Sequence, residues 1–179
     1  QFILTTGRAL LLVDPLALGP VEPTAGTLFA TRAGPVSGLG RLGLAWGASL
    51  GPGVVLSPET ALPVEAAGPG GTVPQPLFFR VPTEAFSQQN LMTAGLERGL
   101  HFGAAGSLRL DAARLERAGL SASPLIGAPQ GTVEVTLGAD DDLSPTALTE
   151  KARGAPERDQ RADGLLGVSL TGLVKSAFE

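Results

Sequence analysis

Three glycines, Gly38, Gly40 and Gly43, open the stretch GLGRLGLAWGASLG (residues 38–51) and reproduce the spacing G-x-G-x-x-G. Loops with this spacing hold the pyrophosphate of a dinucleotide, because glycines let backbone N–H groups approach phosphate oxygens at the start of a helix. Such a loop needs a strand before it and a helix after it. Pro35 leaves little room for the strand, and the glycines that follow make a poor helix. The pattern therefore favours a glycine-punctuated strand over a cofactor loop.

Carboxylates offer a second kind of chemistry. Asp14 ends the apolar run RALLLVDP, and an acid at the end of a buried strand could bind Mg²⁺ beside a phosphate. The chain lacks a G-x-x-x-x-G-K-[ST] loop, so a plain Asp-Pro turn is favoured. Asp140, Asp141 and Asp142 could also offer oxygens to a cation, but without the alternating spacing of a Ca²⁺ loop they indicate a solvated turn. We expect no cofactor, and Asp14, Asp140 and Asp142 stay the candidate metal ligands.

The sequence contains few residues that could act in nucleophilic catalysis. There is no cysteine and a single histidine, His101, which excludes thiolate chemistry and any metal site needing two imidazoles from this chain. A triad could be assembled from His101 with Ser87 or Ser107 and Asp111. No G-x-S-x-G turn is present to expose such a serine, however. We predict no catalytic residue and, with the alternatives below kept open, no enzyme.

Arginine side chains are the remaining candidates for a binding site. Arg8, Arg32, Arg41 and Arg80 could contact nucleic acid if the fold gathered them on one face. The net charge is −4, the arginines are scattered, and aromatic stacking platforms are few. Nucleic-acid binding is therefore a disfavoured alternative.

The secondary-structure elements that carry these side chains are predicted to be short. The chain holds 25 glycines and 15 prolines between apolar runs, which is typical of short strands joined by turns. Leu42, Leu44 and Trp46 recur at every second position and predict a strand. A helix would instead place Leu39, Leu42, Trp46 and Leu50 on one face, but each interior glycine would cost about 1 kcal/mol relative to alanine. Helix or strand stays open for residues 38–50, with the strand preferred.

Further strands and helices follow from periodicity and capping residues. Helices are predicted over residues 83–98, from the N-cap Asp111 to Gly119, and from Ser144 to about Arg153. Strands are predicted at residues 2–4, 9–13, 27–32, 53–57, 61–66, 77–81, 105–110 and 131–139.

These elements predict a mainly β, α+β fold: an antiparallel sheet or sandwich of short strands with two to three short helices. We expect one domain over residues 1–179, with a charged loop or excursion at 138–164. An apolar C-terminal element, strand or helix, follows at 165–179. No apolar stretch reaches the roughly 18 residues of a transmembrane segment.

Sparse charge and many small residues suit surfaces buried against other chains. The sequence therefore favours a non-catalytic structural or protein-interaction module, such as a subunit of an envelope or virion-like assembly, with protein partners or self-assembly. One alternative is a small α/β nucleotide- or metal-binding enzyme using Asp14 and the Gly38–Gly43 loop; a second is an arginine-based nucleic-acid-binding protein. Because the chain begins at Gln1, an exported or envelope-associated protein is slightly favoured. The eleven arginines against two lysines are typical of a GC-rich genome.

Overall fold

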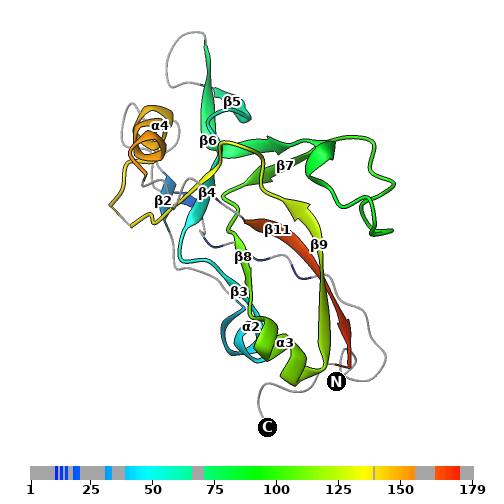
Figure 1. The fold of residues 1–179 in the computed structure, drawn as a ribbon. Helices are drawn as coiled ribbons and strands as arrows, with labels where there is room; N and C mark the ends of the chain where they lie inside the picture. The colour runs from blue at the N-terminus through cyan, green and yellow to red at the C-terminus, as the bar shows by residue number, and fades with distance from the viewer. Residues whose placement is uncertain are drawn as a thin grey trace.

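The computed structural model describes residues 11, 13, 15, 18–20, 31–33, 39–65, 71–138, 140–155 and 164–173. In this part of the chain all paired strands run antiparallel, and short helices lie beside the sheets (Figure 1). The predicted α+β class is confirmed. The strands expected at 2–4 and over most of 9–13 and 27–32 fall outside the described residues.

Short strands and helices make up the fold. The strands are β1 (Leu18–Pro20), β2 (Thr31–Ala33), β3 (Ala48–Leu50), β4 (Val54–Leu56), β5 (Ala61–Glu65), β6 (Thr72–Val81), β7 (Leu100–Gly103), β8 (Leu108–Leu110), β9 (Leu120–Gly127), β10 (Val133–Val135) and β11 (Leu165–Gly172). The helices are α2 (Gly40–Trp46), α3 (Ala112–Ala118) and α4 (Pro145–Arg153), with the 3-10 turn η1 at Thr83–Ala85. The strands form sheets in the orders β1-β2, β10-β4, β3-β8-β11-β9 and β5-β6-β7.

The strand preferred for residues 38–50 is wrong over Gly40–Trp46, which form the helix α2, and is confirmed over Ala48–Leu50, which form β3. Trp46 is buried with Leu115 and Leu120 from α3 and β9, and Leu42 packs against the same cluster. This tertiary packing outweighs the propensity cost of the glycines. Gly43 lets α2 approach β3, since a Cβ there would collide with the backbone of Ala48. The helix ends at its C-cap glycine in the left-handed conformation, as many helices do.

The helix predicted over residues 83–98 is also wrong. Only η1 forms, and a series of turns then leads to β7. Phe86 has an extended backbone, bridges to Ile126 of β9, and is buried beside Phe79 and Val81. Because Phe86 bridges to β9 with an extended backbone and packs in the apolar cluster, the helical conformation cannot continue through it.

The other helices form where their caps predict. Asp111 caps α3 by accepting a hydrogen bond from Arg114 N, and a glycine in the left-handed conformation ends the helix. Ser144 caps α4, which begins with Pro145 and ends at Arg153 inside the charged segment. The alternative left open at the C-terminal element is decided over 165–172, where β11 pairs with β9 and β8. Residues 174–179 lie outside the described residues.

Three apolar clusters make the described core. The first joins α4 to β4, β6 and β10, with Leu56, Leu77 and Leu148 fully enclosed. The second lies between β4, β6 and the Phe86 turn, and the third lies between α2, α3 and β9. The second and third clusters occupy opposite regions of the β9–β11 pair, which contributes side chains to both. Strand β4 likewise supplies the first and second clusters from its two faces.

Candidate functional site

Of the described glycines of the motif, Gly43 serves close packing and Gly40 does not. Gly38 lies outside the described residues, Gly40 begins α2, and Gly43 lies within it. Helix α2 has seven residues, and its N-cap, Leu39, provides no side-chain hydrogen bond. Gly43 is buried where α2 meets β3, and the backbone there leaves no space for a side chain. Close approach of helix and strand thus accounts for the glycine at position 43.

The acidic turn before α4 is held together by local hydrogen bonds. Asp142 accepts one bond from Ser144 N (2.8 Å) and another from Ser144 Oγ (3.0 Å), which orients the cap of α4. Asp140 is exposed at the start of the turn. Asp14 lies outside the described residues. Among the residues that the structure describes, no group of three or more potential ligands could hold a metal ion.

Asp141 connects the same turn to helix α4. Its Oδ2 atom accepts hydrogen bonds from Lys151 Nζ (2.8 Å) and from Gly138 N (2.6 Å). The lysine hydrogen bond, followed by the backbone hydrogen bond, lowers the pKa of the Asp141 carboxyl below its usual value of 3.8. This carboxylate therefore serves the fold of the turn.

The candidate arginines lie on different elements. Arg41 is exposed on α2, which packs against α3, whereas Arg80 is exposed on β6 in the sheet β5-β6-β7. Arg32 belongs to β2, and Arg8 lies outside the described residues. The two arginines whose side chains are described do not share a sheet or a helix pair.

The residues considered for a triad are engaged in separate contacts. Ser107 Oγ donates to Glu134, and Asp111 caps α3 and pairs with Arg114. His101 is exposed on β7. The arrangement gives no serine–histidine hydrogen bond among the described residues.

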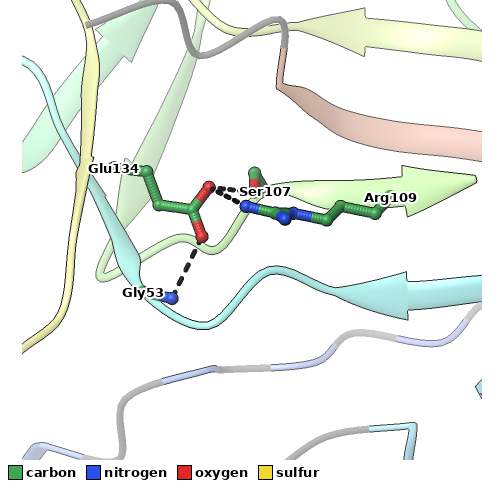
Figure 2. A network of polar contacts seen from close by, with 4 residues as sticks. All are labelled: Gly53, Ser107, Arg109 and Glu134. Atoms are coloured by element: carbon green, nitrogen blue, oxygen red, sulfur yellow. Dashed lines mark hydrogen bonds and ion pairs between the residues drawn. The ribbon is translucent and has the colours of Figure 1, made fainter. Parts of the chain in front are cut away.

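The most connected side chain in the described structure is a carboxylate that the sequence did not single out. Glu134, in the middle of β10, accepts from Gly53 N through Oε1 (3.0 Å). Its Oε2 atom accepts from Ser107 Oγ (2.8 Å) and pairs with Arg109 Nη2 (3.3 Å), as Figure 2 shows. The Glu134 side chain is 14% exposed, whereas that of Arg109 is 61% exposed. We call these four residues the Glu134 clasp.

The Glu134 clasp joins two sheets. The chain leaves β3 in one sheet and enters β4 in another through Gly51 and Gly53. Glu134 belongs to the second sheet, while Ser107 and Arg109 lie at β8 in the first. Gly51 N also donates to Ser107 O (2.7 Å), and a side chain at Gly51 would collide with both the carboxylate and the serine hydroxyl. Both oxygens of this carboxylate are taken up by structural donors, which makes it a poor general base.

The local sequence pattern does not distinguish this carboxylate from other acids. Strand 131–139 alternates apolar and polar residues, so Glu134 shares its polar face with Thr132 and Thr136 and resembles an ordinary solvent-facing acid. Only the Gly-Pro-Gly turn at 51–53, about 80 residues away, offers the backbone donor that it meets. That pairing depends on which strands are neighbours, which local pattern does not specify.

A second unpredicted feature is the loop from Gln88 to Gly99, named here the 88–99 loop. It extends from the end of η1 to β7 and projects from the sheets (Figure 1). Thr93 is buried at its base and donates to Ser87 O (2.7 Å). Asn90 accepts from Ala94 N through its backbone oxygen (2.8 Å) and from Met92 N through its side chain (3.0 Å). Turns and a buried threonine therefore give the loop a defined shape.

The outer part of the 88–99 loop is apolar. Leu91 is 96% exposed, Met92 is 61% exposed, and Leu96 is also exposed. No charged residue occurs from Gln88 to Leu96. Neighbouring exposed leucine and methionine side chains on a structured projection are typical of a surface that another molecule covers.

The described residues thus have an α+β fold of antiparallel sheets, with a structural carboxylate clasp and an exposed apolar loop. Among the described residues no helix is both long and apolar enough to cross a membrane. The whole chain, residues 1–179, matches a family of auxiliary proteins described as an ABC-type uncharacterized transport system, and it belongs to this family. No curated protein and no solved structure matches the chain.

Proposed function

We propose that this chain is a non-catalytic accessory module that binds another protein of an ABC-type transport system through the 88–99 loop. The observation that carries the proposal is the exposure of Leu91 and Met92 on a loop shaped by Thr93 and Asn90. Family membership supports an accessory role and protein partners. It also favours an envelope assembly over a virion-like one as the setting.

The energetics of the loop support a protein contact. Fully burying a leucine or methionine side chain contributes roughly 1.5–3 kcal/mol, so Leu91 and Met92 together could anchor a specific interface. Because Thr93 and the turns already fix the loop, little ordering entropy is lost on binding. The enzyme and nucleic-acid alternatives gain no comparable support, since their described candidate residues lie apart or serve the fold.

Co-purification tests the proposal. The chain is co-expressed with the ATPase and membrane-spanning subunits of an ABC-type system from the same genome, and one tagged subunit is captured. We expect the wild type to be retained and the double variant Leu91→Ser/Met92→Ser to be lost, because the apolar contact is removed.

Leu173→Ser is the matched control, because Leu173 is 79% exposed but follows β11 rather than the loop. Circular dichroism and Tm measurements establish that each variant is folded. Retention of the double variant at the wild-type level, or absence of the wild type from the captured complex, would refute the proposal.

A further inference from the structure

Strand β7 is an edge of the sheet β5-β6-β7. Arg80 N donates to Thr60 O at the start of β5 (2.9 Å), so the backbone groups of Arg80 face β5. Successive residues of a strand direct their backbone groups to opposite sides. Phe79 and Val81 therefore face β7, and Leu77 O does so too, since it accepts from Ala104 N (2.9 Å).

This alternation decides which backbone N–H and C=O groups of β7 hydrogen-bond to β6. Phe79 pairs with Phe102 and Val81 pairs with Leu100, so those two residues of β7 supply its hydrogen bonds to β6. The N–H and C=O groups of His101, and the N–H of Gly103, consequently point away from β6. Both residues are exposed, and no described residue hydrogen-bonds to these outward groups.

Two other edge strands in the described structure are protected. Edge strand β5 carries Pro63, which removes a backbone donor. Edge strand β9 carries Pro124, and its far end is covered by the Phe86 bridge to Ile126. Strand β7 contains no proline, and an unprotected edge is a ready template for another strand.

The two faces of this edge differ in chemistry. Arg80 and His101 are directly opposite each other on the exposed face. In a pair without mutual hydrogen bonds the side chains lie close together. On the other face the rings of Phe79 and Phe102 stack with centroids 6.1 Å apart, beside half-buried Leu100. An added strand would meet donors on one face and apolar side chains on the other.

We propose that β7 binds an extended peptide segment of a partner protein by adding it to the sheet as a fourth strand. The preferred segment alternates acidic and apolar residues, because its acids would lie beside Arg80 and His101 and its apolar side chains beside Leu100 and Phe102. Backbone hydrogen bonds provide affinity in this recognition mode, and alternate side chains provide specificity. The proposal rests on the proposed protein-binding function and deepens it by naming the chemistry of the partner segment.

Synthetic peptides test this edge without any transport subunit. Fluorescein-labelled eight-residue peptides alternate valine with glutamate or valine with lysine, and a third peptide contains the glutamates and valines in separate blocks. We expect anisotropy titrations to show at least about tenfold tighter binding of the alternating glutamate peptide. Methylating every second backbone nitrogen, in either phase, gives two further peptides. One of them must lose binding, because it lacks the donors that face β7.

A second experiment reverses the charge at Arg80. Arg80→Glu is expected to weaken binding of the glutamate peptide about tenfold and to strengthen binding of the lysine peptide, since the sign of the exposed face changes. Arg117→Glu, on exposed α3, is the matched control and is expected to leave both affinities unchanged. Circular dichroism checks that both variants are folded.

The outcomes separate this inference from the proposed function. Equal binding of all peptides, or unchanged binding of both methylated forms, would overturn the fourth-strand proposal even where co-purification through Leu91 and Met92 succeeds. A dimer in which the amides of His101 and Gly103 are protected from hydrogen exchange would assign the edge to a second copy and would equally overturn it.

Discussion

Glu134 shows how one side chain can close a corner of the fold. Its carboxylate accepts from a backbone N–H in the β3–β4 connection, from a buried hydroxyl just before β8 and from an exposed guanidinium on β8. The three contacts contribute unequally to the stability of the fold. Those to Gly53 and Ser107 are shielded from solvent, whereas Arg109 is largely exposed and its ion pair is screened.

We therefore expect an ordered series of stabilities at this clasp. Glu134→Ala leaves the Gly53 N–H and the Ser107 hydroxyl without their acceptor, so the free energy of unfolding falls by about 1–3 kcal/mol. Glu134→Gln keeps an acceptor for Gly53 N and loses less. Arg109→Ala loses at most about 1 kcal/mol, because exposed ion pairs contribute little. Urea unfolding measures all three, and a loss for Arg109→Ala as large as that for Glu134→Ala would contradict this ranking.

At the level of secondary-structure elements, helix α4 is held by its buried face and by an ion pair to the turn before it. Leu148 and Ala152 are buried in the first apolar cluster, while Asp141 ties the preceding turn to Lys151 on the helix. The charged segment at 138–164 thus contains an element that contributes to the core. Because the pKa of Asp141 is lowered in the fold, chiefly by the Lys151 hydrogen bond, its contribution to stability depends on pH.

The sign of this dependence follows from the lowered pKa. The stabilisation is complete above the unfolded-state value of 3.8 and is lost as the pH falls through the lower folded-state pKa. Asp141→Asn removes it, so the variant is less stable than wild type at pH 7. The difference is at most about 1 kcal/mol, since both side chains are about one-third exposed and solvent screens the pair.

Urea unfolding from pH 7 to pH 2 measures this effect, and we expect the two curves to converge below about pH 4. Asp140→Asn, which removes the neighbouring exposed carboxylate and leaves the ion pair intact, is the control, with an expected change under about 0.5 kcal/mol. A difference between Asp141→Asn and wild type that stays constant down to pH 2 would contradict the assignment.

At the scale of the whole molecule, the apolar clusters share strands. Strand β4 supplies both the first and the second cluster, and the β9–β11 pair contributes to the second and the third. The Glu134 clasp connects the sheets to which these strands belong. Shared strands make independent unfolding of one cluster unfavourable, so the single-domain prediction can be tested by unfolding.

A single domain predicts one cooperative unfolding transition. Trp46, the one tryptophan, is buried in the third cluster between α2 and α3, so its fluorescence reports that end of the molecule. Far-ultraviolet circular dichroism reports all the helices and strands. We expect the two signals to give the same midpoint in urea. Separate midpoints would divide the chain into more than one cooperative unit.

Features with local causes could be predicted correctly from the order of the amino acids. Asp111 and Gly119 specify the ends of α3, and Ser144 with Pro145 specifies the start of α4, because caps act on backbone groups within a few residues. The frequent glycines and prolines between apolar runs likewise determined the class of short antiparallel strands.

Tertiary structure alone decided the features that depend on distant partners. Trp46 lies in a helix because Leu115 and Leu120 bury it, and Phe86 ends a turn because β9 offers Ile126 as its bridge. Glu134 is a clasp because Gly53 and Ser107 converge on it. In each case burial or hydrogen bonding between residues far apart in the chain outweighs the local helix or strand propensity, which amounts to about 1 kcal/mol per residue. Local sequence patterns carry only that propensity.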